Sequence, residues 1–277
     1  YSQRFFRPIQ DLSDKYNILQ AAMASAERIF KLLDTPVTVA DPTSSQRLEK
    51  PQGRVEFRNA GFAYRDEHRV IEKVSFTIEP GETVAVVGHT GAGKTTLTNL
   101  LLRFYDVQDG EILFDGINIR DLRLRDLRQN FGMVLQDPFL FTGTIASNIR
   151  LGTEGISDAK LREATRQVNI LDFIETLPGG FNEPVKERGA TLSVGQKQLL
   201  SFARALAHNP RVLVLDEATS SVDPETEALI RDALRHLLEN RTSLVIAHRL
   251  STIQNASKIV VMHKGHVREV GTHQELL

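Results

Sequence analysis

A glycine-rich loop at residues 88–95, with the sequence GHTGAGKT, constrains the fold of this chain more than any other feature. It matches the spacing G-x-x-x-x-G-K-[ST] without exception, and it directly follows the apolar run Thr83–Val87. Glycines let such a loop curl so that successive backbone N–H groups point at phosphate oxygens. The Leu-rich segment after the loop is typical of a helix, whose positive dipole end favours the same anions. We therefore expect an α/β fold with a nucleotide site where a buried strand ends.

The side chains of this loop have separate expected roles. Lys94 reaches the β- and γ-phosphates of ATP, and the hydroxyl of Thr95 is a ligand of Mg²⁺. The alternative is a chance glycine loop, but the apolar strand before it and the helix after it argue against chance. The residues expected to contact the nucleotide here are Gly88, Thr90, Gly91, Ala92, Gly93, Lys94, Thr95 and Thr96.

A pair of carboxylates follows a second apolar run. Asp216 and Glu217 come directly after Val212–Leu215. In open α/β sheets, ligands bind at the carboxyl ends of the strands. We expect Asp216 to hold Mg²⁺ through water and Glu217 to orient and deprotonate the attacking water. Two acids at the end of a strand are otherwise an ordinary loop start, and only the phosphate loop upstream favours the catalytic interpretation.

Composition excludes several other functions. The net charge of −1 over 277 residues predicts no nucleic-acid partner. The absence of cysteine excludes disulfides and cysteine-based metal or nucleophile chemistry. No stretch approaches 18 consecutive apolar residues, so no membrane span is expected within this sequence.

Short apolar segments alternate with helix-forming segments along the chain, as in an α/β sheet. Buried parallel strands are expected at Thr83–Val87, Val212–Leu215, Leu244–Ala247 and Ile259–Met262, and an antiparallel layer at 54–58, 74–78 and 111–114. Helices are expected at 94–105, 158–176, 195–207 and 225–239. The stretch from about 136 to 208 has few strand signals, which predicts a helical insertion.

The amino-terminal part has a different pattern. Apolar residues recur at alternating spacings of four and three over residues 11–33, which predicts an amphipathic helix. Packing on its own domain or on a coiled-coil partner are the simplest explanations for such a helix. Residues 37–53 are rich in Pro, Ser and Thr and are expected to form a linker.

With these motifs in place, the chain resembles the nucleotide-binding domain of ATP-binding cassette (ABC) transporters, of the exporter branch, over nearly its full length. The resemblance implies a P-loop NTPase of the ABC ATPase fold, with a mixed core sheet, an antiparallel β-subdomain and a helical subdomain at about 136–208. The order and spacing of the motifs are more specific than any single one. They are the phosphate loop 88–95, Gln136, Leu192–Gln196, Leu215–Glu217, Ser220–Asp223 and His248.

In that family, the signature motif of one subunit binds the γ-phosphate held by the phosphate loop of the other. The segment Leu192–Gln196 corresponds to this motif, with Ser193, Gly195 and Gln196 as the nucleotide-contacting residues. Ser193 is a plausible N-cap, and Gly195 exposes backbone N–H at the positive end of a helix. Val194 departs from the pattern, which usually has glycine here. Valine adopts helical φ, so we expect the fold to survive, with an effect on dimer closure.

The same resemblance implies roles for four further residues. Gln136 contacts Mg²⁺ and the attacking water, and His248 donates to the γ-phosphate and holds Glu217 in place. Tyr64 stacks on adenine, although a strand aromatic in the core is its alternative, and Asp223 crosses the dimer interface. The other seven histidines, including His89, are expected to be solvated or structural.

The expected partners are a second nucleotide-binding domain and the transmembrane domain of the same polypeptide. A homodimer is favoured over a heterodimer, because the catalytic residues are all present. The Gln136 loop and Glu187-Arg188-Gly189 are expected to contact the transmembrane domain. Residues 1–36 are then the cytoplasmic extension of the last transmembrane helix, 37–53 a linker and 54–277 the ATPase domain. This places the chain on the cytoplasmic face of a membrane, as part of a multi-pass protein.

The predicted function is ATP hydrolysis that powers export. A non-transport ABC ATPase is one alternative, but such proteins interpose long coiled coils, and only about a hundred residues lie between Lys94 and Ser193. A slow or regulatory cassette is the other, and Val194 is its only support. The transported substrate is not predictable from this sequence, because selectivity lies in membrane helices.

Overall fold

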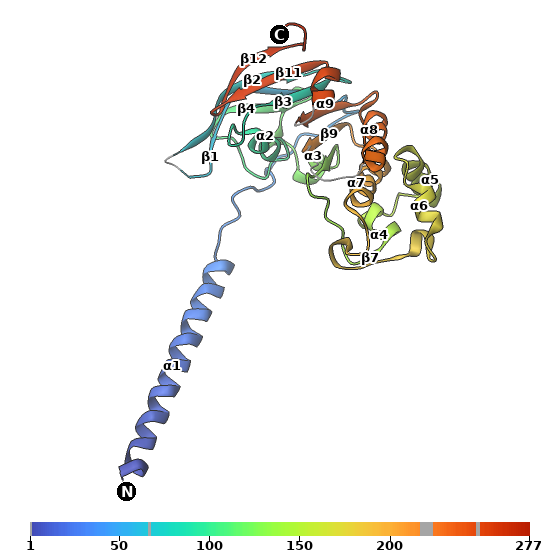
Figure 1. Ribbon diagram of the computed structural model, residues 1–277. Coiled ribbons are helices and arrows are strands. Elements are labelled where there is room, and N and C mark those ends of the chain that lie inside the picture. Colours follow the sequence, from blue (N-terminus) through green and yellow to red (C-terminus); the bar gives the residue numbers. More distant parts are fainter. Residues whose placement is uncertain (1, 66–67, 217–223, 248–249) are drawn as a thin grey trace. The chain divides into compact units, whose positions relative to one another are not determined.

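The computed structural model describes residues 2–65, 68–216, 224–247 and 250–277 (Figure 1). It separates into two units, 1–40 and 41–277, which we describe one at a time. The first unit is built around α1 (Ser2–Leu33), which ends where the apolar stripe predicted but begins nine residues earlier than expected. Among the described residues, no helix combines the length and the hydropathy that crossing a membrane requires.

The second unit contains the predicted antiparallel layer. In the described part of the chain, this sheet has four strands in the order β2-β1-β4-β5. Their bounds are β1 (Val55–Ala63), β2 (Arg69–Ile78), β4 (Asp109–Phe114) and β5 (Ile117–Asn118). Phe57 and Phe76 face each other across β1 and β2, with ring centroids 4.6 Å apart. Buried aromatic pairs of this kind fix the register of the layer.

The core sheet is mixed, as expected. Its described strands run in the order β12-β11-β3-β10-β9-β6, and all neighbours are parallel except β11 and β12. Their bounds are β3 (Thr83–Val87), β6 (Phe131–Val134), β9 (Val212–Asp216), β10 (Thr242–Ile246), β11 (Lys258–His263) and β12 (His266–Gly271). The strands β6 and β12 were not predicted, because β6 is short and β12 is a half-exposed edge strand without a continuous apolar run.

Both faces of this sheet are covered, which explains the continuous apolar runs. Along β3, Ala85 belongs to one hydrophobic cluster, whereas Val84 and Val86 belong to the other. In β9, Leu213 and Leu215 face the first cluster, with Val212 and Val214 in the second. The helices on the sheet and beside it are α2 (Lys94–Leu101), α3 (Leu124–Arg128), α8 (Pro224–Leu238) and α9 (Leu250–Asn255).

Two helices are shorter than predicted, for local reasons. The helix after the phosphate loop ends at Leu101 instead of Tyr105, because Arg103 adopts φ +52° and turns its side chain inward to Asp106. The helix expected over 158–176 is divided in two at Asn169, which has φ +60°. Asparagine is one of the few residues that take this conformation readily, so it ends helices as glycine does.

The helical part predicted at about 136–208 lies between β6 and β9 in the sequence and beside α8 (Figure 1). Its elements are β7 (Gly143–Thr144), α4 (Ile145–Arg150), α5 (Asp158–Gln167), α6 (Leu171–Thr176), β8 (Pro184–Val185) and α7 (Val194–His208). One hydrophobic cluster joins α7 residues such as Phe202 to Ala85 and Val245 of the core sheet. The helical part therefore shares a core with the sheet.

Some residues from the stretch expected to be a linker pack on the second unit. Leu124 N donates to Asp41 Oδ1 at 2.7 Å, and Gln46 forms a β-bridge with Leu122. The backbone N–H groups of Gly53 and Arg54 donate to the Asp115 carboxylate. The second unit accordingly begins at Asp41.

Candidate functional site

The parallel strands bring the predicted site residues to one edge of the core sheet. Ile246 of β10 aligns with Val86 of β3 on one side and with Asp216 of β9 on the other. Val134 of β6 aligns with Leu215 of β9. Because parallel strands all end at the same edge, the phosphate loop, Asp216 and the Gln136 loop leave the sheet side by side.

The phosphate loop is held against the neighbouring strands with no room for side chains at two of its glycines. A Cβ on Gly88 would lie 2.3 Å from the carbonyl oxygen of Met262, in β11. A Cβ on Gly93, which has φ +99°, would lie 2.7 Å from Ile71 Cδ1 and 3.0 Å from the carbonyl oxygen of Val70. These contacts require glycine at both positions.

Lys94 curls back over the loop. Its side chain is buried, and Nζ donates to the carbonyl oxygens of Gly88 at 2.7 Å and His89 at 3.1 Å. Burial lowers the pKa of Lys94, and the nearby carboxylate of Asp216 opposes that shift. The Lys94 ammonium interacts electrostatically with Asp216. Together with the hydroxyl of the neighbouring exposed Thr95, it offers donors that suit a nucleotide phosphate.

Tyr64 lies beside the start of α2. Its hydroxyl is 3.3 Å from Thr96 Oγ1 and accepts from Asn99 Nδ2 at 3.2 Å. Its ring makes edge contacts with Phe62 and Tyr105, at centroid distances of 4.9 and 5.1 Å, and 45% of the residue is exposed. Tyr64 is therefore not a core aromatic, and stacking on adenine stays a prediction.

The Gln136 loop and the segment Glu187-Arg188-Gly189 lie together, which the sequence did not predict. Gln136 is exposed, and four residues later Leu140 is fully buried. A Cβ on Gly189 would lie 2.8 Å from Leu140 Cδ1, so the two segments are in close contact. Nearby, β7 pairs with β8 through Gly143 and Val185. The two segments expected to face the transmembrane domain thus pack against each other.

Ser193 is the N-cap of α7, as predicted. Its Oγ accepts from Gln196 N at 3.2 Å, and Gln196 Oε1 accepts from Ser193 N at 2.9 Å, which is a capping box. Val194 is the first helical residue, one earlier than expected, and is 56% exposed. Valine at this position is therefore compatible with the fold. Gly195 is buried.

The signature segment is not hydrogen-bonded to the phosphate loop of its own chain in the part that the structure describes. Within the part of the chain that the structure describes, no hydrogen bond joins residues 88–96 to residues 192–196. Ser193 is exposed at the start of α7. Three other predicted residues, Glu217, Asp223 and His248, lie outside the described residues.

Sequence reasoning missed a contact of His89. Its Nε2 lies 3.0 Å from Nδ1 of His263, at the end of β11, and its Nδ1 lies 2.8 Å from the carbonyl oxygen of Thr90. Burial, together with His89 and nearby cations, lowers the pKa of His263. These two histidines are far apart in the sequence, so no local pattern could have indicated the pair.

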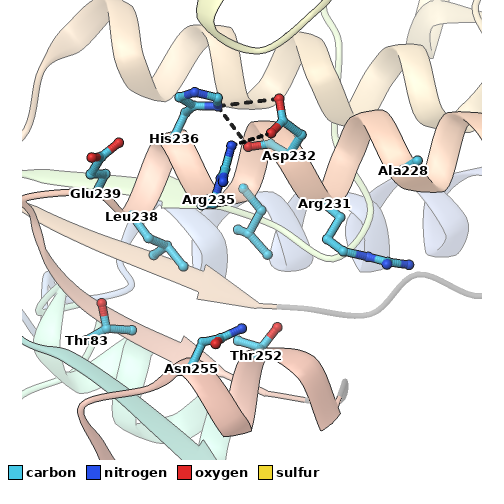
Figure 2. A pocket seen from close by; sticks show the side chains of 11 residues that line it. Thr83, Ala228, Arg231, Asp232, Arg235, His236, Leu238, Glu239, Thr252 and Asn255 are labelled. Atoms are coloured by element: carbon cyan, nitrogen blue, oxygen red, sulfur yellow. Dashed lines mark hydrogen bonds and ion pairs between the residues drawn. The ribbon is translucent and has the colours of Figure 1, made fainter.

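One cavity of the second unit lies away from the phosphate loop. It has a volume of about 870 Å³ and lies between α8 and α9, with Thr83 at its floor (Figure 2). Thr83 begins β3, so this cavity is at the opposite edge of the sheet from Gly88. Three of its charged or titratable side chains form one cluster: Asp232 accepts from Arg235 at 2.9 Å and lies 3.5 Å from His236. The phosphate loop instead begins where β3 ends.

Comparison with known proteins identifies relatives along the entire chain. A family model described as ABC transporter matches residues 71–220, more than half of the chain. The Bacillus subtilis protein YheH, a probable multidrug resistance ABC transporter ATP-binding/permease protein, is 48% identical over 277 residues, which are 100% of this chain and 41% of that protein. A fatty acid ABC transporter ATP-binding/permease protein of Mycobacterium bovis is also 48% identical, over 100% of this chain and 44% of its own length.

A solved structure of a bacterial Atm1-family ABC exporter with ATP bound is similar, with a TM-score of 0.84 and 39% identity. The likeness covers 99% of this chain and 48% of that one. The chain therefore spans about half the length of the relatives it matches.

Proposed function

The chain belongs to the ABC transporter family, and from this premise we propose that it hydrolyses ATP for an exporter, as one of two facing copies that enclose two ATP molecules. The observation that carries the proposal is the separation of the two phosphate-reading elements. Lys94 lies at the edge of the core sheet, whereas Ser193 is exposed at the start of α7, without a hydrogen bond to residues 88–96 among those described. A second copy can supply Ser193 to the nucleotide that Lys94 holds.

The chemistry follows from charge neutralisation and positioning. Lys94 and the backbone N–H groups of the loop bind the phosphates, and Ser193 with Gly195 of the other copy donates to the γ-phosphate. Thr95, Gln136 and Asp216 would hold Mg²⁺, which supplies further neutralisation of the phosphate charge.

Two predicted residues complete the reaction. Glu217 takes the proton of the attacking water, and His248 holds that carboxylate and donates to the γ-phosphate. Asp223 and Tyr64 bind the facing copy and the adenine, respectively. The roles of Glu217, Asp223 and His248 rest on the family resemblance, since these residues lie outside the described part of the chain.

The proposed membrane partner docks on the surface formed by residues 136–144 and 187–189. Two exposed apolar residues, Phe139 and Phe141, lie on this surface, where a helix of a transmembrane domain would find an apolar contact. The relatives' names join ATP-binding and permease parts in one protein, which supports such a partner at the cytoplasmic face of a membrane. Two relatives of equal identity are named for the transport of different compounds, so we infer that this domain does not choose the substrate.

Complementation between two inactive variants tests the two-copy site. Lys94→Ala and Ser193→Ala should each lower the ATPase rate at least about a hundredfold, because each removes a donor to the transferred phosphoryl group. In a mixture, each mixed dimer has one site with both residues intact. Half of randomly formed dimers are mixed, so the mixture should recover about a quarter of the wild-type sites.

The matched control is Lys94→Ala mixed with the double variant Lys94→Ala, Ser193→Ala, which forms no intact site. Recovered hydrolysis in the first mixture alone supports the proposal. Equal rates in the two mixtures would show that each copy hydrolyses ATP by itself.

A slow or regulatory cassette is the second candidate, and the exposed Val194 beside Ser193 is the observation that favours it. The variant Val194→Gly separates the two candidates. A large gain in turnover would indicate that Val194 keeps this cassette slow, whereas an unchanged rate supports an ordinary ATPase. Loss of hydrolysis in Glu217→Gln checks that the measured rate belongs to the proposed site.

A further inference from the structure

The loop that joins β6 to α4 is fixed by polar side chains from two helices. This loop, residues 135–144, carries Gln136 and the exposed pair Phe139 and Phe141, whose rings are 5.0 Å apart. It has no regular structure before β7, so its backbone groups need partners elsewhere. The partners come from α4 and α7.

Asn148 of α4 fixes the second half of the loop. It is 2% exposed, and its amide makes both hydrogen bonds with the backbone of Phe141: Oδ1 accepts from N and Nδ2 donates to O, each at 2.8 Å. Nδ2 also donates to the carbonyl oxygen of Thr144 at 3.0 Å. The loop around Phe141 is therefore held firmly on α4.

Arg204 of α7 connects both of these segments to the signature helix. Its Nε donates to the carbonyl oxygen of Asn148 at 2.9 Å, and its Nη2 donates to the carbonyl oxygen of Phe139 at 3.2 Å. Burial lowers the pKa of Arg204, and no carboxylate in the described part of the chain forms an ion pair with it. Its charge is balanced by backbone carbonyl dipoles, which only this arrangement of loop and helix brings together.

Arg204 lies on the helix that begins at the signature. Ser193 caps α7, and Arg204 lies eleven residues further along the same continuous helix, about 16 Å away. Close to Arg204, His208 Nε2 donates to the carbonyl oxygen of Ile149, so two side chains of α7 hold the end of α4. A shift of the carbonyl group of Phe139 must therefore either break the hydrogen bonds that Arg204 donates or move α7.

We infer that Arg204 is a positioning residue that couples the Gln136 loop to the Ser193 end of α7. A displacement at the exposed Phe139 and Phe141, and the approach of Ser193 to nucleotide, are then parts of one movement. This inference rests on the proposed function, because it gives Gln136 and Ser193 roles in hydrolysis. The planar guanidinium is essential, since it spans two carbonyl groups that lie on different segments.

The test compares Arg204→Lys with Arg166→Lys in the chain. Arg166 is an exposed arginine of α5 that pairs with Glu163, so its replacement controls for the same chemical change in the helical part. Lysine keeps the charge but has one donor group, and it cannot bridge both carbonyl groups. Hydrogen exchange over 135–144 and steady-state ATPase kinetics are the two measurements.

We expect Arg204→Lys to speed exchange in residues 135–144 and to lower kcat about tenfold, while KM for ATP changes less than about twofold. Arg166→Lys should change none of these. If Arg204 only stabilised the fold, Arg204→Lys would lower the melting temperature without lowering kcat more than it changes KM. Unchanged exchange in 135–144, or unchanged kcat, in folded Arg204→Lys would overturn the inference.

A measurement on the wild type avoids any folding defect. On addition of a non-hydrolysable ATP analogue, exchange should change together in residues 135–144 and in 193–197. A response in one segment without the other would also overturn the coupling. If the wild type hydrolyses no ATP at all, the proposed function fails, whereas the exchange measurement still decides whether the two segments are coupled.

Discussion

At the scale of single residues, backbone geometry selects the phosphate site. Gly88 and Gly93 lie so close to β11 and β2 that no side chain fits. Gly91 and Gly81 also have positive φ, but a Cβ at either would meet no atom within 4 Å. Gly88 and Gly93 are thus required because a side chain would clash, whereas Gly81 and Gly91 are favoured only by their positive φ.

The pair Gly88→Ala and Gly81→Ala tests that distinction. Alanine at Gly81 should cost about 1–2 kcal/mol of unfolding free energy, from its left-handed backbone alone. Alanine at Gly88 must also push away the carbonyl oxygen of Met262, and overpacking adds about 1–3 kcal/mol. If the alanine displaces the loop, every 1.4 kcal/mol needed to restore its binding conformation weakens ATP binding about tenfold.

Urea denaturation and titration with a fluorescent ATP analogue measure the two effects. Gly81→Ala is the control, since it lies in the turn between β2 and β3, away from the loop. If Gly88→Ala bound ATP as tightly as Gly81→Ala does, the close contact with Met262 would not shape the site.

At the scale of elements, one of the contacts between α7 and α4 is made by a histidine. His208 Nε2 donates to the carbonyl oxygen of Ile149 at 3.1 Å. Burial, with Arg204 and Lys160 nearby, lowers the pKa of His208 below its ordinary value of 6.5. The neutral imidazole is therefore the form that joins the two helices.

Stability should consequently fall in acid. As pH decreases from about 6.5 towards the folded-state pKa of His208, the unfolded chain binds this proton more readily than the folded chain does. The free energy of unfolding therefore decreases through that window. His208→Gln keeps an N–H donor and removes the titration, so its stability should depend less steeply on pH.

Urea denaturation between about pH 5 and pH 8 measures this slope. His68→Gln, at an exposed position, is the control and should follow the wild type. Parallel curves for wild type and His208→Gln would contradict the assignment of acid sensitivity to the α4–α7 contact.

Some helices and strands could be predicted from the sequence pattern alone, and others could not. The run Thr83–Val87 was predicted to the residue, because a strand covered on both faces reads as a continuous apolar segment. The edge strand β12 was not predicted, because its apolar and polar residues do not alternate clearly. The break at Asn169 was not predicted, because it depends on the backbone conformation of a single residue. The cap at Ser193 was predicted, because its chemistry is local.

At the scale of the whole molecule, we expect turnover to require two chains. The phosphate loop begins where β3 ends, and no hydrogen bond joins Ser193 to it within the described part of the chain. The ATPase rate per molecule should therefore rise with protein concentration until most chains are paired.

Light scattering on the Glu217→Gln variant measures the mass of the species directly. Without hydrolysis, ATP should hold two chains together, with twice the 31.0 kDa mass of one chain. The same variant without ATP, and Lys94→Ala with ATP, should stay at the mass of one chain. A rate per molecule that is constant over a thousandfold dilution, with no paired species, would rule out the two-copy site.

The sequence alone determined the family and the mixed α/β fold, which the comparisons confirm, and it predicted the phosphate loop. These depend on local patterns: strand period, glycine spacing, and the order of short motifs. Only the tertiary structure decided that the Gln136 loop lies against Gly189, that Arg204 joins this loop to α7, and that His89 meets His263. Such contacts join residues distant in the chain, and their energies depend on burial and on geometry that no local pattern contains.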